Sequence, residues 1–301
     1  MRVRHAIGVL ALAALLPTAR AAAQDLEPRA YSPSPVGASF VVAGYGRSDG
    51  RVMFDANAPI TNAHADLNLA TVGYGHIFNL AGRQASLALA APYLWGEASG
   101  DVGEDRRTIH RSGLGDLRLR ASLLLIGGPA LSRQAFAARK PKPILGVSLV
   151  AVAPTGEYMP DKLINIGANR WAFKPEIGVS VPLGRWQADA YAAVWLYQDN
   201  DDYLGGKRLE RDPMSAFQVH LSYTFRPGLW AAVDSTYYSG GATTTNGARD
   251  ANRQENARLG MTVSVPIRQG QAMQFVASKG ALTRFGGDFT SVAVTWRAVK
   301  F

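Results

Sequence analysis

The chain has 301 residues, of which 47% are hydrophobic and 18% are charged, and its formal net charge is +9. This composition excludes intrinsic disorder, which requires low hydrophobicity together with high charge. The sequence contains no cysteine, which excludes disulfide scaffolds, cysteine-ligated metal sites and cysteine nucleophiles. The basic residues are distributed along the chain and no helix–turn–helix or zinc-finger spacing occurs, so we expect no nucleic-acid partner.

The first 23 residues have the pattern of a secretory signal peptide. Arg2 and Arg4 form a basic start, and residues 6–16 form an apolar run that is too short to span a bilayer. Three alanines at 21–23 fit a small-residue cleavage site. We therefore expect export of the chain and cleavage near Ala23.

Beyond the signal peptide, stretches of about ten residues alternate between apolar and polar side chains, which is typical of β-strands. The clearest cover residues 85–95, 116–125, 170–183, 217–225, 256–265 and 292–301. Short connections at 80–83, 183–185, 226–228 and 268–270 alternate with long polar ones near 48–65, 98–111, 156–169, 199–211, 239–252 and 283–288. The segment 127–142 is long where a short turn is expected, and we interpret it as a periplasmic excursion.

These features predict an all-β protein, a transmembrane antiparallel up-and-down β-barrel of about 12 strands with both termini in the periplasm. Barrel closure pairs every backbone polar group within lipid. A soluble β protein would show the same alternation with its apolar face inward. Tyr93, Trp171 and Tyr223 favour the membrane barrel, because they lie at the ends of apolar faces, where aromatic girdles belong.

We divide the chain into a signal peptide (1–23), an N-terminal segment (24–35) and a β-barrel (36–301). The N-terminal segment is rich in proline and cannot be a central strand, so it is either a periplasmic tail or a plug of the barrel. The last strand ends on Phe301, which resembles the signal read by the barrel-assembly machinery. The register of Phe301 also contains Arg297, whereas the opposite register is more apolar, and only a bulge would reconcile the two.

The polar faces of the predicted strands carry charges of both signs. The candidates for the lumen lining are Asp116, Arg118, Arg120, Arg170, Lys174, Glu176, Asp189, His220, Asp234 and Arg258. They either select a solute or form ion pairs that stiffen the wall and leave little free bore. Tyr191, Trp195 and Tyr197 are candidates for stacking on an aromatic solute, or alternatively belong to an interfacial girdle.

Other sequence features point to weaker alternatives. His220 and Ser222 lie two residues apart on one strand face, which suits an esterase or phospholipase pair, but that face is the polar one. Acidic residues of the predicted loops lack the pattern of a calcium loop, and the histidines show no ligand spacing. We therefore expect no enzyme activity, no metal and no cofactor.

Five longer strings, at residues 26–33, 111–118, 153–158, 165–176 and 231–241, resemble a proteobacterial family described as "putative meta-pathway of phenol degradation". The string Asn-Arg-Trp-Ala-Phe-Lys-Pro-Glu at 169–176 is the most specific. The resemblance runs from about residue 26 to residue 301. It implies an outer-membrane barrel that admits aromatic or other hydrophobic compounds, and it transfers no catalytic or binding residue.

Taken together, the sequence predicts an outer-membrane channel or transporter for small molecules. Its expected partners are outer-membrane lipid and lipopolysaccharide, the barrel-assembly machinery, and a small-molecule solute. The alternatives are a structural barrel with a closed lumen and, less favoured, the esterase or phospholipase.

Overall fold

The computed structural model describes residues 26–53 and 60–301. The expected signal peptide and its cleavage site near Ala23 lie outside these residues. The described chain consists almost entirely of β-strands, with one short helix, α1 (Arg133–Ala137). No helix in the described ranges is long and apolar enough to cross a membrane.

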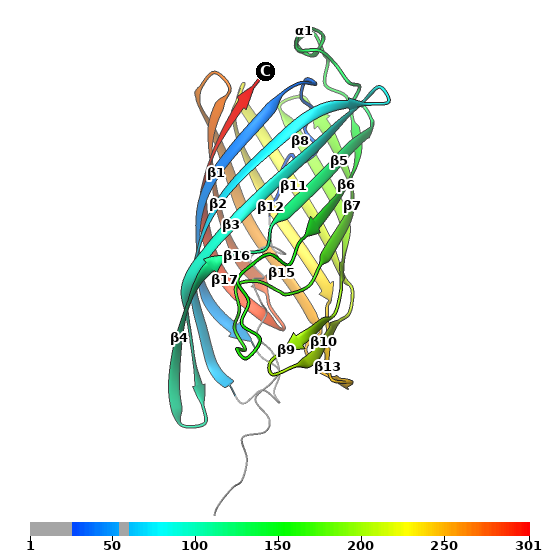
Figure 1. Cartoon of the computed structure of the whole chain (residues 1–301). Coiled ribbons are helices and arrows are strands. Elements are labelled where there is room, and N and C mark those ends of the chain that lie inside the picture. The colour runs from blue at the N-terminus through cyan, green and yellow to red at the C-terminus, as the bar shows by residue number, and fades with distance from the viewer. Residues whose placement is uncertain (1–25, 54–59) are drawn as a thin grey trace, which may run out of the picture.

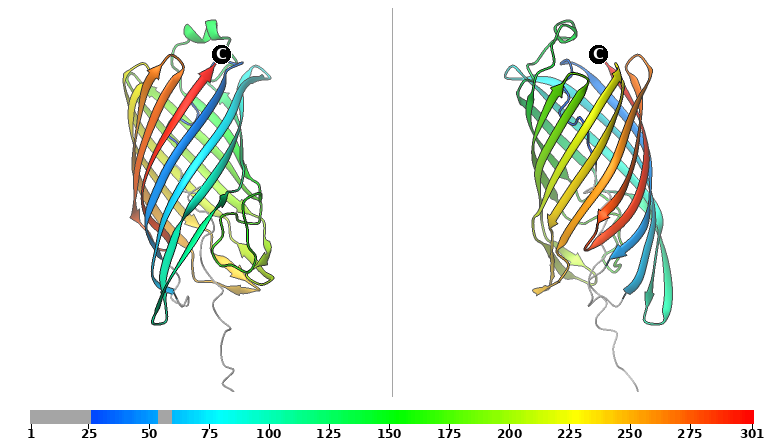
Figure 2. Two further views of the ribbon diagram at one scale, coloured as in Figure 1. Left: turned by 60° about the vertical axis from the view of Figure 1, so that its left-hand side comes forward. Right: turned by 180° about the vertical axis from the view of Figure 1, so that it is seen from behind.

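The described residues form a closed antiparallel barrel, as the sequence predicted (Figures 1 and 2). Each strand pairs with its sequence neighbour in the barrel, and the pairing of β1 with β17 closes the wall. The twelve barrel strands are β1 (Ser39–Met53), β2 (Ile60–Leu80), β3 (Arg83–Val102), β5 (Arg118–Ile126), β6 (Ile144–Val152), β7 (Ala172–Leu183), β8 (Trp186–Tyr197), β11 (Met214–Arg226), β12 (Leu229–Gly240), β15 (Gln254–Arg268), β16 (Gln271–Leu282) and β17 (Gly286–Lys300).

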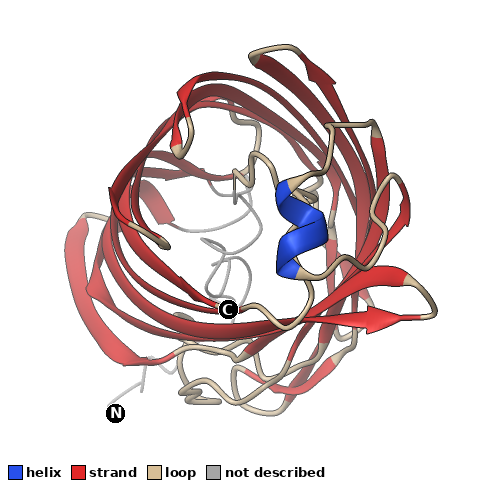
Figure 3. Cartoon of the chain, turned by 90° about the horizontal axis from the view of Figure 1, so that it is seen from above, coloured by secondary structure: helices blue, strands red, loops and turns tan. Residues whose placement is uncertain are grey.

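One end of the barrel, here called the turn end, carries tight connections. Between β2 and β3, Ala81 and Gly82 both have positive φ, as a two-residue hairpin turn with the right-handed twist of the strands requires. The exception is the connection from β5 to β6, which contains α1 and projects beyond the barrel wall (Figure 1). From above, α1 lies at one side of the barrel opening (Figure 3).

The opposite end, here called the loop end, contains more strand than the sequence predicted. The expected loops near 48–65 and 98–111 are largely extensions of β1, β2 and β3, with β4 (Asp105–Leu114) paired only to β3. The loops near 199–211 and 239–252 form a separate four-stranded sheet of β9 (Asn200–Tyr203), β10 (Lys207–Arg211), β13 (Thr243–Thr245) and β14 (Ala248–Arg249). Beyond the apolar band of the wall, a strand can be polar on both faces. Such a strand lacks the alternation of apolar and polar residues by which strands are recognised in a sequence.

The apolar faces predicted for β5, β7, β11, β15 and β17 point outward. Leu119, Val179, Val219, Leu259 and Val292 are each at least 41% exposed. Their sequence neighbours on the opposite face are mostly buried or half-buried. A soluble protein would bury such a surface, so a continuous apolar exterior of this kind indicates a barrel surrounded by lipid.

The last strand resolves the conflict between its two registers. β17 pairs with β1 and β16 without a register shift, so no bulge occurs. Val292 is exposed on the outside, which turns Thr295 and Arg297 toward the interior. Phe301 follows the strand and is exposed, and its ring centre lies 4.9 Å from the Arg133 guanidinium carbon of the α1 connection.

A candidate channel lumen

The N-terminal residues preceding β1 lie inside the barrel. Tyr31 is 1% exposed and packs against the inner faces of β6 and β7. A methyl group at Gly146 or Gly178 would overlap the Tyr31 ring, so these two glycines create the space that the ring occupies. At the turn end, the backbone N–H of Gly37 donates to the Ile77 carbonyl, which ties the segment to β2 just before β1 begins.

Polar contacts hold the same segment against the interior wall. The Arg29 guanidinium donates to Ser222 (2.9 Å) and Thr224 (2.7 Å) of β11 and lies 4.6 Å from the ring centre of Trp230. The backbone N–H of Ala30 donates to the Tyr191 hydroxyl at 3.1 Å. The segment therefore occupies the side of the lumen bounded by β6, β7, β8, β11 and β12, which we call the packed side.

The charged candidates next to this segment form one ion-pair network. Glu176 is paired with Lys174 (3.2 Å) and Arg120 (3.2 Å), and it accepts a hydrogen bond from the Tyr31 hydroxyl at 2.9 Å. Arg120 also pairs with Glu27 of the N-terminal segment. Because Lys174 and Glu176 are almost fully buried, each charge depends on the others for compensation.

A second polar group crosses the neighbouring strands of the packed side. The His220 Nδ1 lies 2.7 Å from an Asp234 oxygen, and the other Asp234 oxygen accepts from the Thr262 hydroxyl at 2.6 Å. Asp189 accepts from the Ser180 hydroxyl at 2.5 Å. Each of these buried side chains has at least one hydrogen bond, which offsets part of the cost of its burial. Within the described residues, His220 Nε2 and the second oxygen of Asp189 have none.

The three aromatic candidates also face the packed side. Tyr191 is in edge contact with Tyr31, with 5.3 Å between ring centres. Trp195 stacks on Tyr197 and has the Lys174 ammonium 5.6 Å from its ring centre. These rings are thus occupied by groups of the chain itself.

Three further candidates lie where the barrel meets the loop end. Asp116 precedes β5, and its two oxygens accept the backbone N–H groups of Gly156 (2.8 Å) and Ala168 (2.9 Å). Burial raises the pKa of this carboxyl, although the backbone donors oppose that shift. Arg170 is buried with its guanidinium carbon 5.2 Å from the Tyr197 ring centre, and Arg118 is half-buried at the start of β5.

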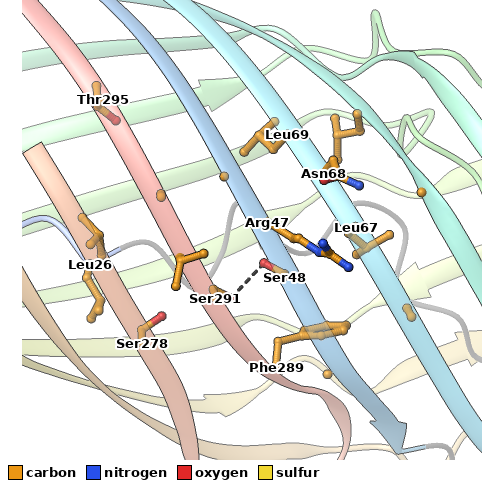
Figure 4. A pocket seen from close by; sticks show the side chains of 18 of the residues that line it. Leu26, Arg47, Ser48, Leu67, Asn68, Leu69, Ser278, Phe289, Ser291 and Thr295 are labelled. Atoms are coloured by element: carbon orange, nitrogen blue, oxygen red, sulfur yellow. Dashed lines mark hydrogen bonds between the residues drawn. The ribbon is translucent and has the colours of Figure 1, made fainter.

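The other side of the lumen, bounded by β1, β2, β3, β15, β16 and β17, contains a cavity of about 680 Å³ (Figure 4). We call it the cavity side. Its lining is mainly apolar, with leucine, valine, isoleucine and phenylalanine on inward positions. These apolar lining residues include Leu26, Phe40, Val42, Leu67, Leu69, Leu94, Ile109, Ile164, Ile166, Val276 and Phe289.

Of the thirteen predicted site residues, Arg120 and Arg258 line this cavity. Arg258 donates to the Ser278 (2.9 Å) and Ser291 (2.7 Å) hydroxyls. The apolar lining and Arg297 were missing from the sequence prediction, which took polar residues as the mark of the inward face. In β1, β2 and β16 many inward positions are apolar, so only the strand register could have identified them.

The geometry does not support the esterase alternative. The Ser222 hydroxyl accepts from Arg29 and lies 3.4 Å from the Gln187 carbonyl, and within the described residues it has no hydrogen bond to His220. An activated serine needs a base within hydrogen-bond reach and access to a substrate. Ser222 is 0% exposed. Within the described ranges, no group of three or more His, Asp or Glu side chains could hold a metal ion.

A closed up-and-down barrel with an apolar exterior and an internal cavity defines the class of transmembrane β-barrels found in outer membranes. The sequence pattern of the family described as "Putative MetA-pathway of phenol degradation" matches residues 43–292. The chain therefore belongs to this family, in agreement with the resemblance noted from its sequence strings. No curated protein sequence matches the chain.

Solved structures share the fold at low sequence identity. The COG4313 outer membrane channel from Pseudomonas putida F1 has a TM-score of 0.76 and 23% identity, with 92% of this chain and 100% of that chain covered. The β domain of the Bordetella autotransporter Brka has a TM-score of 0.54 and 12% identity, covering 87% and 99%. The transport unit of the Escherichia coli autotransporter AIDA-I has a TM-score of 0.53 and 9% identity, covering 92% and 93%.

Proposed function

We propose that the protein is an outer-membrane channel that admits small apolar or aromatic solutes through the cavity side of its lumen. The observation that carries this proposal is the apolar lining of a cavity of about 680 Å³ inside a barrel wall. A general pore for hydrophilic solutes would be lined by polar groups, because water and ions have to pass. Here the polar groups are concentrated on the packed side, where they bind one another and the N-terminal segment.

In this proposal the chain is exported, its signal peptide is removed near Ala23, and both termini face the periplasm. The turn end then lies on the periplasmic side, together with α1. Phospholipid and lipopolysaccharide surround the apolar exterior. The assembly machinery recognises the strand that ends at Phe301, which the exposed position of this residue permits.

The test is uptake of a hydrophobic fluorescent probe, N-phenyl-1-naphthylamine, by cells with an intact outer membrane that express the chain. We expect faster uptake than in cells without it, and little change in the uptake of a sugar of similar size. The cavity variant is Ala293→Trp, because Ala293 faces inward and lines the cavity. Its matched control is Val292→Trp. Val292 borders the same cavity, but it is 54% exposed and alternates with Ala293, so its side chain lies on the lipid side of the strand.

We expect Ala293→Trp to slow probe uptake and Val292→Trp to leave it unchanged. Heat-modifiable gel migration would show that both variants are folded. Equal uptake of sugar and probe would instead indicate a general pore. No uptake by a folded wild-type barrel would favour the structural barrel with a closed lumen.

A further inference from the structure

The cavity is apolar, but the charges that face it are mostly positive. Arg29, Arg111, Arg120 and Arg258 line it, as does Arg297, and all five lie on inward positions of strands or on the N-terminal segment. The lining also includes two carboxylates and a sixth arginine. Glu27 is paired with Arg120. Arg47 and Glu97 lie on outward positions of β1 and β3, where they contact Asp66 and His110. An apolar space with an excess of guanidinium groups suits a ligand with an apolar body and an anionic group.

Arg297 differs from the other cavity arginines in its contacts. Arg29 and Arg120 are held by the packed side, Arg258 by two serine hydroxyls, and Arg111 donates to the carbonyl of Ile164. Arg297 has no hydrogen bond or ion pair with any of the described residues, and it is exposed to the cavity. Its five donors are therefore available to a solute.

Apolar side chains lie next to Arg297 on the neighbouring strand. In the register of β1 with β17, Val42 lies directly opposite Arg297, and Phe40 lies opposite Val299 on the same inward face. Cross-strand neighbours in these two positions are within reach of a long side chain. A planar apolar group that contacts Phe40 and Val42 would thus place its anionic substituent at the guanidinium.

The cavity is also polarised along β17. Phe289 and Arg297 both line it and lie eight residues apart, or about 26 Å at about 3.3 Å per residue. Isoleucines 109, 164 and 166 surround the loop-end part, whereas Gln274, Thr295 and Arg297 are at the turn-end part. An amphiphilic anion would therefore bind with its charged group toward the turn end.

The electrostatics of the turn end favour the same ligand. Its connections and the last residues of β17 contain no Asp or Glu, over residues 79–84, 126–144, 182–187, 225–230, 266–272 and 297–301, all of which are described. Its basic residues outside the cavity are Arg83, Arg133, Arg139, Lys140, Lys142, Arg185, Arg226, Arg268 and Lys300. A field of one sign at the end of a low-dielectric channel attracts ions of the opposite sign.

We infer that the channel is selective for organic anions with an apolar or aromatic body, and that Arg297 is the residue that recognises the anionic group. This inference rests on the proposed function, because it concerns the same cavity. The proposed function gives the cavity a preference for apolar over polar solutes, and this inference adds a preference for anions over cations. Neutral hydrocarbons would pass without a contribution from Arg297.

The experiment uses two permanently charged probes with the same aromatic body. Naphthalene-1-sulfonate is the anion and trimethyl(1-naphthylmethyl)ammonium is the cation, and neither crosses lipid readily. Entry into liposomes that contain the refolded mature chain is followed by quenching of naphthalene fluorescence. We expect the wild type to admit the sulfonate faster than the ammonium ion.

Four variants separate the contribution of Arg297 from that of the positive electrostatic field at the turn end. Arg297→Gln should lower the anion-to-cation ratio by roughly threefold to tenfold, the value of about one charge-assisted contact. Arg297→Lys should retain most of the preference, and Arg297→Glu should reverse it. Arg268→Gln removes one positive charge from the β15–β16 turn outside the cavity, and it should change the ratio much less.

The outcomes separate the two proposals. The anion inference would be overturned if the wild type preferred the cation. It would also be overturned if Arg297→Gln left the anion-to-cation ratio unchanged while Ala293→Trp slowed both probes. In either case the cavity would remain the path of the solute. An equal effect of Arg268→Gln and Arg297→Gln would also overturn the anion inference, since the field alone would then set the preference. If Ala293→Trp affects neither these probes nor N-phenyl-1-naphthylamine, the proposed function itself is wrong.

Discussion

Asp116 shows how a single carboxylate connects three parts of the loop end. It lies between β4 and β5, and each of its oxygens accepts a backbone N–H from the 156–168 region. Gly156 and Gly167 approach each other so closely that a methyl group on either would overlap the other backbone. The carboxylate thus closes the 153–171 connection over the barrel, next to the cavity-lining residues Ile164 and Ile166.

Asp116→Asn should loosen this connection. An amide offers one acceptor oxygen, and its NH₂ group would face the second backbone donor, so a buried N–H loses its partner. The expected cost is about 1–3 kcal/mol of local stability. Limited proteolysis should therefore cut the variant faster within residues 156–169. Asp161→Asn is the control, because Asp161 is exposed in the same connection, and equal cleavage of both variants would contradict this role.

The residues around Lys174 lead to a different expectation from the sequence prediction. The sequence predicted that Arg170 and Lys174 line the lumen, where they either select a solute or form ion pairs. The structure places both on the packed side, where Lys174 compensates Glu176. Loss of Lys174 would leave the buried charge of Glu176 with less compensation, which is a defect of folding rather than of selectivity.

At the level of elements, the N-terminal segment determines how much of the lumen is free. It contributes Leu26, Glu27 and Arg29 to the cavity lining, and its Tyr31 covers Gly146 and Gly178 on the inner faces of β6 and β7. It is bound by side-chain contacts to β7, β8 and β11, and only its last residues pair with the wall. It is therefore an element that can leave the lumen while the barrel stays closed.

Removal of residues 24–37 from the mature chain should widen the lumen. We expect a higher single-channel conductance in planar bilayers and a weaker preference between solutes, because the polar packed side becomes accessible to water. The control is Glu27→Gln, which keeps the segment and weakens one ion pair. A conductance equal to that of the full mature chain would show that the segment does not restrict the path.

Gly146 and Gly178 have no positive φ, so their backbone conformation does not require glycine. They accommodate the N-terminal segment because they have no side chain. Both face the interior on adjacent strands and pair with each other in the β6–β7 register. In the sequence, the two glycines only interrupt the alternation of apolar and polar residues. The position of the Tyr31 ring shows why glycine is present at both positions.

On the scale of the whole molecule, the barrel separates three environments: lipid outside, the packed side, and the cavity side. The exterior is the surface on which folding in a membrane depends. Leu119 and Val179 are each 41% exposed on it, at the start of β5 and near the middle of β7. Their environment is expected to be hydrocarbon.

Leu119→Arg and Val179→Arg should each impair folding into lipid. A charge on the lipid face of a barrel costs roughly 2–4 kcal/mol at the midplane and less toward the interfaces, so we expect the larger effect at Val179. The measurement is the urea dependence of folding into liposomes, with Leu119→Ala and Val179→Ala as controls for the loss of packing. Unchanged folding of both arginine variants would show that these faces do not contact lipid.

The sequence by itself determined the class of the fold. Alternating strands separated by short and long connections identified a twelve-stranded membrane barrel, because alternation reflects two different solvents on the two faces of a strand. Five longer sequence strings identified the family. The orientation of individual strands was also readable wherever one face is polar, as in β7 and β11.

Only the tertiary structure decided how the lumen is divided. Where both faces of a strand are apolar, as in β1 and β2, the sequence carries no contrast, and the pairing register alone shows that Phe40, Val42 and Leu67 face inward. The contacts of Arg29, Tyr31 and Glu176 join residues more than 100 positions apart, which no local pattern encodes. In the sequence, Arg297 stood out only as a polar residue in the register of Phe301, and barrel closure placed it in the cavity.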